Sequence, residues 1–372
     1  MIKDSIKENE LSDNMDITDD KEEILDRVMN DESQSIQERN NKITKDDILT
    51  PERLRKLLNE IKPEFLRIYD IIKVIGSGSE SIVYQAIHIS SQRIIAIKFI
   101  IFGKEKKGNY NEINIFNKFK NQYLISCYGF YEIKKGELNC IIMEYAKFGN
   151  IRNFQRNLIK KNYLSEQLLC FFSSQILKGI KYCHLCKITH FDIKPQNIII
   201  DNYLNLKIID FSVSIDYNKI TSKKIKLPLR GTNFYIAPEV IKSQEIETKN
   251  LNKIDIYSFG VILYNLAFGV YPYGLVYEDV GNYDKIYDKI KNENLEFNNE
   301  YYNFSPYFID FLKKILEKDI NKRININEAL GHYWIKGADI LNDEKEKTFN
   351  AGSFLINLIT DHIMKFDEYI KK

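Results

Sequence analysis

The sequence predicts an α+β fold in which a sheet-rich lobe precedes a larger, mainly helical lobe. Between Tyr69 and Ile101, β-branched residues alternate in short runs broken by Gly and Ser, which is typical of antiparallel strands. After Gly149 the apolar residues recur mostly at helical spacing. A chain of 372 residues with 44% hydrophobic content is also long enough to bury a sizeable core.

The small lobe is expected to begin with a helical lead-in over residues 49–68. Thr50 is a suitable helix cap, and Pro51 fits the first turn. The apolar residues that would share one face and pack on the small lobe are Leu54, Leu57, Leu58 and Ile61. Strands are expected within 71–75, 82–84, 94–100 and 140–143, with a helix over 111–120.

The large lobe is expected over residues 147–336, after a small lobe over 69–144. Its long helical segments are predicted at 165–186, 253–268, 305–318 and 325–334. Residues 337–372 end in an amphipathic pattern that predicts one more helix. Packing of this helix on its own large lobe is the preferred interpretation, and binding of a regulatory partner is the alternative.

The first 50 residues are strongly acidic, with 15 Asp or Glu against 7 Lys or Arg, a net charge of −8. The rest of the chain has 47 basic and 37 acidic residues, or +10. Residues 1–48 contain few aromatic residues, so we expect a disordered tail. A solubilising role is preferred over an intramolecular pseudosubstrate that binds the basic remainder.

The five cysteines form an odd set in a long chain without a signal-like apolar start, which indicates reduced thiols in a cytoplasmic or nuclear setting. No stretch is apolar enough for a membrane span. Cys183 and Cys186 have the spacing of metal ligands, but no second ligand pair accompanies them. A structural role at the end of a helix is therefore the preferred interpretation.

The segment His190-Phe191-Asp192-Ile193-Lys194-Pro195-Gln196-Asn197 groups a carboxylate, an ammonium and an amide. These groups suit phosphoryl transfer. Asp192 is placed to accept the proton of an attacking hydroxyl, and Lys194 to neutralise charge on the moving phosphoryl group. Asn197 offers an oxygen ligand for magnesium.

Further motifs occur in a fixed order around this segment. Ala96-Ile97-Lys98 lies upstream, and Asp210-Phe211-Ser212 and Ala237-Pro238-Glu239 lie downstream. In this order the chain resembles a eukaryotic protein kinase of the serine/threonine type over about residues 70 to 336. The resemblance implies a bilobal protein-kinase-like fold that uses ATP and Mg2+ and acts on protein substrates. Nucleic acid is not an expected partner.

Gly76-Ser77-Gly78 lies between two expected strands, so it suits a hairpin over a nucleotide, although an ordinary Gly-Ser turn is the alternative. The resemblance implies that these residues cover the phosphates and that others surround the adenine. The implied nucleotide-binding residues are Ile75, Gly76, Ser77, Gly78, Val83, Ala96, Lys98, Met143, Glu144, Ala146 and Ile199. Met143 would precede the hinge Glu144-Tyr145-Ala146, whose backbone would bind adenine.

The resemblance also implies a pair between Lys98 and a helix glutamate. Lys98 ends an apolar strand, where an ammonium is costly unless it finds a partner. Glu112 is the preferred partner and Glu105 the weaker candidate. Asp210 follows an apolar strand and is assigned to magnesium together with Asn197.

Two structural contacts are implied as well. Glu239 should form a buried ion pair with Arg323, and Asp255 should anchor the catalytic loop. Lys194 and Thr232 resemble the serine/threonine kinases rather than the tyrosine kinases, so serine or threonine hydroxyls are the expected acceptors.

Three positions depart from the family pattern. Ser81 replaces the third glycine of the turn, and Ser212 replaces a glycine that follows the magnesium aspartate. Phe191 replaces an arginine that usually pairs with a phosphorylated activation loop, so we expect less dependence on such phosphorylation. The departures leave a pseudokinase scaffold as the alternative function. A small-molecule kinase is disfavoured by the segment from Thr232 to Glu239.

Overall fold

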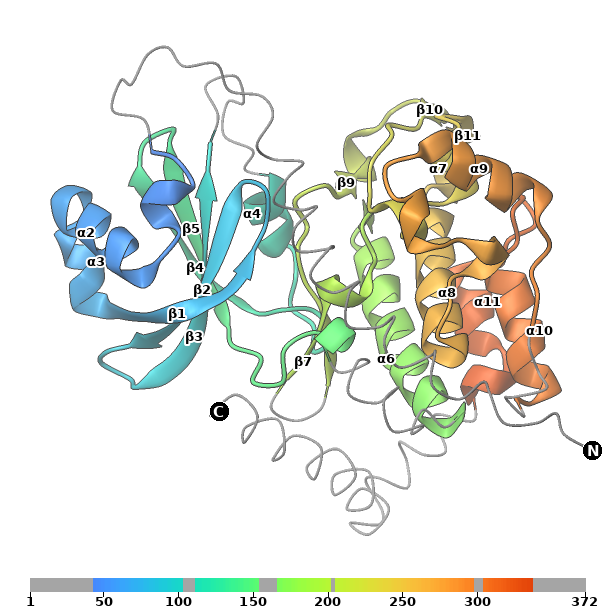
Figure 1. Cartoon of the computed structure of the whole chain (residues 1–372), viewed down its shortest axis with the longest axis horizontal. Helices are drawn as coiled ribbons and strands as arrows, with labels where there is room; N and C mark the ends of the chain where they lie inside the picture. The colour runs from blue at the N-terminus through green and yellow to red at the C-terminus, as the bar shows by residue number, and fades with distance from the viewer. Residues whose placement is uncertain (1–42, 103–110, 154–165, 202–204, 298–303, 337–372) are drawn as a thin grey trace, which may run out of the picture.

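The computed structural model describes residues 43–102, 111–153, 166–201, 205–297 and 304–336. Two lobes lie side by side, one built on a sheet and one built mainly of helices (Figure 1). One hydrophobic cluster fills the large lobe and reaches the small lobe at Ala96, Ile141 and Met143. A second cluster lies wholly within the small lobe. The predicted α+β, bilobal architecture is confirmed.

A five-stranded antiparallel sheet forms the small lobe, with the strand order β1-β2-β3-β5-β4. Its strands are β1 (Tyr69–Ser77), β2 (Ser81–His88), β3 (Arg93–Ile101), β4 (Cys127–Lys134) and β5 (Leu138–Glu144). Burial alternates along β2, where Ile82, Tyr84 and Ala86 are buried, because successive side chains point to opposite faces. Four of the strands occur where the sequence predicts them, whereas β4 was not predicted.

Two helices cover one face of this sheet (Figure 1), namely α2 (Pro51–Ile61) and α3 (Pro63–Ile68). The Thr50 side chain caps α2 by accepting a hydrogen bond from the Arg53 N–H at 3.3 Å, as predicted. Leu54 and Leu58 are fully buried in the small-lobe cluster. The prediction that the lead-in packs on the small lobe is therefore confirmed.

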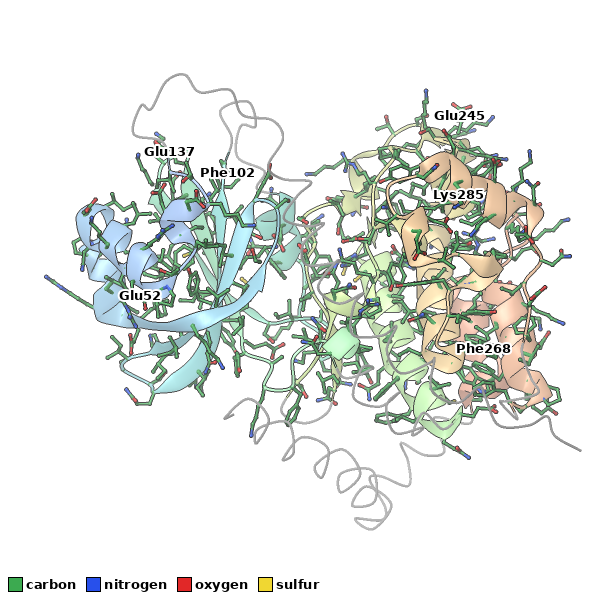
Figure 2. The ribbon with its side chains drawn as sticks, viewed as in Figure 1. Glu52, Phe102, Glu137, Glu245, Phe268 and Lys285 are labelled. Carbon is green, nitrogen blue, oxygen red and sulfur yellow. The ribbon has the colours of Figure 1, made fainter. Side chains whose placement is uncertain are left out.

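The boundary of the expected tail at residue 48 is wrong. Ile43 and Ile48 are buried in the small-lobe cluster, and residues Asp46–Ile48 form the short helix η1. The Tyr84 hydroxyl donates to the Ile48 carbonyl at 2.5 Å, and the Ile43 N–H donates to Glu137, which Figure 2 labels. Ile43 and Ile48, near the two ends of this short acidic segment, thus pack into the small-lobe cluster. Residues 1–42 lie outside the described residues, so a disordered tail stays a prediction for them.

The large lobe is organised around α8 (Lys253–Phe268), which is buried along almost its whole length. The remaining α-helices among the described residues are α4 (Asn111–Phe116), α6 (Glu166–Leu185), α7 (Pro238–Ile241), α9 (Tyr283–Asn292), α10 (Pro306–Ile315) and α11 (Ile326–Gly331). The helices predicted at 165–186 and 253–268 are confirmed almost to the residue. α9 was not predicted.

The helix predicted over 325–334 is interrupted, since the His332 backbone is extended (φ −67°, ψ 141°) and α11 ends at Gly331. The helix predicted over 111–120 ends early, at Phe116. The expected C-terminal helix and its regulatory partner fall within 337–372, outside the described residues. No helix in the described ranges combines the length and the hydrophobicity that crossing a bilayer requires.

Three pairs of short antiparallel strands lie in the large lobe; Asp192, Lys194 and Asn197 lie between β6 and β7, and Asp210 follows β8. They are β6 (Ile188–Thr189) with β9 (Ile215–Asp216), β7 (Ile198–Ile200) with β8 (Leu206–Ile208), and β10 (Lys224–Lys226) with β11 (Glu245–Glu247). The short 3-10 helices are η2 (Pro195–Asn197), η3 (Tyr217–Lys219), η4 (Asn233–Tyr235), η5 (Thr248–Asn250), η6 (Pro272–Gly274) and η7 (Tyr277–Asp279).

Candidate active site

A buried charge cluster joins the two lobes. The Lys98 ammonium on β3 lies 2.9 Å from both carboxylate oxygens of Glu112 on α4, and 2.9 Å from Oδ1 of Asp210. Lys98 is 8% exposed and Glu112 only 3%. The predicted pairing of Lys98 with Glu112 is confirmed, while the weaker candidate Glu105 lies outside the described residues.

The three groups shift one another's pKa values. Burial alone would lower the pKa of Lys98, but the charges of Glu112 and Asp210 outweigh it and raise that pKa. Burial opposes ionisation of Asp210 too, yet the nearby ammonium lowers the pKa of this carboxyl well below its usual range. Burial dominates for Glu112 and raises its pKa. Lys98 and Asp210 are therefore held in their charged forms.

Asp210 follows β8 and its backbone is left-handed, with φ +64°. Among the described residues of this turn, the positive φ belongs to Asp210 and not to Ser212, which replaces the glycine of the family pattern. The Ser212 side chain also contributes to the lowered pKa of Asp210. Phe211 is fully buried, and its N–H donates to Glu112 at 3.3 Å. The turn is thus tied directly to α4.

A second group of polar side chains surrounds Asp192. Thr232 Oγ1 donates to Asp192 Oδ1 at 2.7 Å and accepts from the Lys194 ammonium at 2.8 Å. The same ammonium lies 3.0 Å from Asp192 Oδ2. Asn197 Nδ2 donates to the Asp192 carbonyl at 2.9 Å and to Oδ2 at 3.0 Å. Four residues that the sequence singled out therefore meet around one carboxylate.

Asp255 on α8 anchors the backbone of the loop that contains Asp192, as predicted. Its carboxylate accepts the N–H groups of His190 and Phe191, each at 2.9 Å. Phe191 is 3% exposed and has a φ of +67°, which is rare for an aromatic residue. The two hydrogen bonds help to hold this strained backbone. The third partner of Asp255, His184 Nε2 at 2.9 Å, was missed, although a histidine in the last turn of a long helix was visible in the sequence.

Gly231 allows the activation segment, residues 216–239, to approach the catalytic loop, residues 190–197. Its φ is +104°, and a Cβ at this position would lie 2.7 Å from the Phe191 carbonyl oxygen. Such a contact is far too short for a side chain, so the position requires glycine. The next residue is Thr232, whose hydroxyl meets Asp192. Close backbone contact at Gly231 thus places that hydroxyl.

The predicted ion pair of Glu239 and Arg323 is confirmed. Two parallel hydrogen bonds join the side chains, Nη1 to Oε1 at 2.7 Å and Nη2 to Oε2 at 2.9 Å. Arg323 is 1% exposed and Glu239 is 2% exposed. The guanidinium also donates to the carbonyls of Glu317 and Lys253, which satisfies more of its N–H groups. The pair fastens the end of the activation segment to the large lobe.

Most of the residues assigned to the nucleotide lie on adjacent strands of the small lobe. Gly76 is paired with Val83 across β1 and β2, and Val83 is paired with Lys98 across β2 and β3. Ala96 is paired with Met143 across β3 and β5. This register brings the predicted adenine contacts and the phosphate-side lysine onto one part of the sheet.

The turn between β1 and β2 is closed by a hydrogen bond from the Gly78 N–H to the Ser81 carbonyl at 2.8 Å. Ile75, which precedes the turn, is 42% exposed, and Ser77 ends β1. Exposed apolar surface at Ile75 is available to a ligand. The replacement of a glycine by Ser81 is compatible with this tight turn.

Glu144 ends β5 at the connection to the large lobe, and its carboxylate has two partners. It accepts the Ser126 N–H at 2.9 Å and pairs with the Lys207 ammonium at 2.8 Å. Lys207 was not singled out in the sequence, although a lysine within the apolar run of β8 signals a buried partner. Ile199 on β7 is 8% exposed and forms an isolated bridge with Asn150, shortly after Ala146. The hinge and β7 therefore lie close together.

Asn197 and Asp210 suit magnesium by their chemistry. Both offer oxygen atoms, the ligand type that Mg2+ prefers. Because Asn197 uses its Nδ2 for Asp192, its Oδ1 stays available as an acceptor. The Asp210 side chain is 35% exposed, so its carboxylate can be reached. Among the described residues, no group of three or more His, Cys, Asp or Glu is placed to hold a metal, and Cys183 and Cys186 are both free thiols.

The protein kinase domain family matches residues 69–335 of this chain. The serine/threonine-protein kinase pakH of Dictyostelium discoideum is 33% identical over 272 residues, which cover 73% of this chain and 50% of that protein.

Two further relatives agree with this match. The serine/threonine-protein kinase hippo of Drosophila melanogaster is 30% identical and is matched over 77% of this chain and 41% of its own length. The SNF1-related protein kinase catalytic subunit alpha KIN12 of Arabidopsis thaliana is also 30% identical, over 72% of this chain and 51% of that protein. The chain spans about half the length of the relatives it matches, or less.

Proposed function

The chain belongs to the protein kinase domain family, and on that premise we propose that it transfers the γ-phosphoryl group of ATP to serine or threonine hydroxyls of protein substrates. The observation that carries the proposal is the arrangement around Asp192. An ammonium, an amide and a threonine hydroxyl converge there, each with a polar atom within 3.0 Å of the Asp192 carboxylate. Phosphoryl transfer depends mainly on such positioning and on charge stabilisation.

Asp192 is proposed to orient the acceptor hydroxyl and take its proton. Its Oδ1 already accepts the Thr232 hydroxyl, which supports a role in holding a hydroxyl group. Lys194 lies beside the same carboxylate and would stabilise negative charge on the phosphoryl group in transit. The pairing of Lys194 with Thr232 supports serine or threonine acceptors, as the sequence pattern implied.

ATP is proposed to bind between β1, β2, β3 and the hinge. Val83, Ala96, Met143 and Ile199 would contact the adenine, and backbone groups of Glu144 and Ala146 would bind its polar edge. Ile75, Gly76, Ser77 and Gly78 would cover the phosphates. Lys98 would bind the phosphates, since Glu112 holds its ammonium in the charged form.

Magnesium, held by Asn197 and Asp210, would supply positive charge to the phosphate oxygens. The chain's own contribution is to orient these two oxygen ligands. Asn197 is fixed through its bonds to Asp192, and Asp210 through its bond from Lys98. The residues departing from the family pattern remove none of these charged groups, so an active enzyme is favoured over a pseudokinase scaffold.

An intracellular setting is proposed, where ATP is available. All five cysteines are free thiols, which supports a reducing compartment. This proposal does not distinguish cytoplasm from nucleus.

The proposed activity is tested by incubating the purified chain with labelled ATP, Mg2+ and a generic protein substrate, followed by phosphoamino-acid analysis. Label on serine and threonine is expected. Asp192→Asn keeps the size of the side chain and should reduce turnover by at least about a hundredfold, because it removes the general base. Nucleotide binding by both proteins, without label transfer by either, would establish the scaffold function instead.

A further inference from the structure

The activation segment of this chain carries charged side chains of one sign only between Asp216 and Glu239. Between Asp216 and Glu239 the sequence contains no acidic residue. The same stretch contains five basic residues, namely Lys219, Lys223, Lys224, Lys226 and Arg230, and all five are exposed. The whole chain has a net charge of only +2, so this density of positive charge is local.

Two of these cations face carboxylates. β10 and β11 pair antiparallel, so Lys224 lies opposite Glu247 and Lys226 lies opposite Glu245, which Figure 2 labels on the large lobe. The pKa of Glu247 is lowered by its hydrogen bond with Lys249 and, to a smaller extent, by the charge of Lys224. The positive charges of Lys224 and Lys226 are therefore partly compensated by their own strand pair.

The other three cations have no such partner. Among the described residues, no ion pair involves Lys219, Lys223 or Arg230. They are called the free cations below. An exposed guanidinium without a carboxylate partner keeps its planar set of donors available for an anion.

The free cations lie on the stretch that leads to the acceptor position. Arg230 precedes Gly231, whose backbone contacts the Phe191 carbonyl, and Thr232 bonds to Asp192. Two residues of extended chain span at most about 7 Å, so the backbone of Arg230 lies within that distance of Thr232. The strand pair β10–β11 holds the earlier part of the segment, and the Leu227 N–H continues it by donating to Gln244 at 3.0 Å.

We propose that Arg230, supported by Lys223 and Lys219, selects substrates whose acceptor serine or threonine is flanked by anionic side chains. This inference rests on the proposed kinase function and names its substrate class. Carboxylates of Asp and Glu, or the phosphate of a phosphoserine, supply the required charge. Basic peptides are disfavoured by the same cations, because like charges brought together near the acceptor raise the free energy of binding.

The chain itself supplies a suitable probe. The peptide of residues 10–23 contains seven acidic residues, one lysine, and the acceptors Ser12 and Thr18. Its matched control carries Asn and Gln in place of every Asp and Glu. A third peptide is the control with one phosphoserine added after the acceptor, which distinguishes phosphate from carboxylate as the recognised anion.

Two measurements use these peptides with the full chain, after phosphatase treatment to remove any phosphate from the segment. The first is the KM and kcat for phosphorylation. The second is fluorescence anisotropy of labelled peptides in which Ser12 and Thr18 are replaced by alanine, so that binding is read without turnover. The acidic peptide is expected to bind at least about tenfold more tightly than its neutral control, since several exposed charge pairs of about two- to fivefold each contribute.

Variants assign the effect to the free cations. Arg230→Gln should reduce the acidic preference about threefold, and the double variant Lys223→Gln/Arg230→Gln by about tenfold. Lys224→Gln, whose cation faces Glu247, should have a smaller effect. Lys56→Gln, an exposed lysine on α2 in the other lobe, should have none. The preference should also weaken as salt rises, because exposed charges are screened.

The outcomes are distinct. Equal binding of the acidic and neutral peptides would overturn the inference while leaving the kinase function in place. Binding of anionic vesicles without discrimination among the peptides would do the same. Acidic preference in anisotropy without phosphorylation of any peptide or protein would overturn the kinase function and keep the anion site. A preference that survives in the double variant would show that other residues provide it, which also overturns the assignment.

Discussion

Arg323 and Glu239 face each other through two parallel hydrogen bonds of 2.7 and 2.9 Å, with both side chains almost wholly removed from solvent. Breaking such a pair leaves one charge buried without its partner. Arg323→Ala or Glu239→Ala should therefore lower the free energy of unfolding by about 3–5 kcal/mol. Urea denaturation followed by far-UV circular dichroism measures the change.

An exposed ion pair provides the control for this prediction. Lys314 lies 2.7 Å from Asp310, but both side chains are about half exposed. Lys314→Ala should leave the free energy of unfolding nearly unchanged. Equal losses in the Lys314 and Arg323 variants would contradict a special role for burial.

Gly231→Ala is expected to reduce turnover more than it reduces nucleotide binding. The new Cβ would lie 2.7 Å from the Phe191 carbonyl oxygen and on a backbone with φ +104°. The segment must move to relieve the contact, and the Thr232 hydroxyl then loses its position beside Asp192. Strain of this kind costs about 1–3 kcal/mol, so kcat should fall by about tenfold or more.

Gly331→Ala is the matched control, because no heavy atom lies within 4 Å of a Cβ built there. Its kcat and its unfolding midpoint should equal those of the unchanged protein. If Gly231→Ala also left kcat unchanged, the close backbone approach would not be needed to place Thr232.

Asp279 makes the stability depend on acid pH. Its carboxylate is fully buried and contacts the ammonium groups of Lys285 and Lys289, each at 2.7 Å. Burial opposes ionisation, but hydrogen bonds from the two lysines and from the Val276 N–H prevail and lower the pKa of Asp279 to about 2 from 3.8. A depressed pKa in the folded state means that the stabilisation is present above the unfolded pKa and is lost as pH falls toward 2.

Asp279→Asn should thus lower the free energy of unfolding by about 1–2 kcal/mol at pH 7 and by much less near pH 2. Denaturation curves at a series of pH values measure the difference between the two proteins. A difference that stayed constant across the series would assign the loss to packing rather than to charge.

Leu58→Ala should destabilise the small lobe by about 2–5 kcal/mol, because a fully buried leucine leaves a cavity in the small-lobe cluster when it is truncated. Glu60→Ala on the exposed side of the same helix is the control and should change little. Thermal unfolding compares the two. A small effect of Leu58→Ala would mean that the packing of α2 against the sheet contributes little to the free energy of unfolding.

Turnover is expected to persist after phosphatase treatment. Phe191 occupies the place of an arginine that would bind a loop phosphate, and the segment is held instead by the β10–β11 pair and by buried Leu227. Activity before and after treatment, with mass spectrometry of Thr221 and Ser222, provides the measurement. Loss of activity that rephosphorylation restored would contradict the expectation.

The charged centre of the site was predictable because its residues occur in short motifs whose order limits how they can meet. Lys98, Asp192, Asn197 and Asp210 were assigned from such motifs. The ion pair of Glu239 with Arg323 was implied by the resemblance to the kinase family, although the two residues are far apart in sequence. The resemblance therefore carries long-range information that local propensity does not.

Other features lacked a signal of this kind. β4 has irregular burial and two shifts in its pairing with β5, so it lacks the alternation that predicts a strand. β10 and β11 have three residues each and exist because they pair with each other. The contact of His184 with Asp255 depends on how α6 and α8 pack. Composition alone assigned residues 43–48 to the tail, since their charges concealed two buried isoleucines.

The residues that precede Tyr69 limit where this protein can be truncated. A truncated polypeptide beginning at Tyr69 would retain every residue assigned to ATP and to the acceptor. It would, however, leave Tyr84 and Phe99 without the side chains of Ile48, Leu54, Leu58 and Phe65 that now cover them. Such a fragment would expose a hydrophobic surface that favours self-association. The residues before Tyr69, which are assigned no contact with substrate, are thus required for an active enzyme.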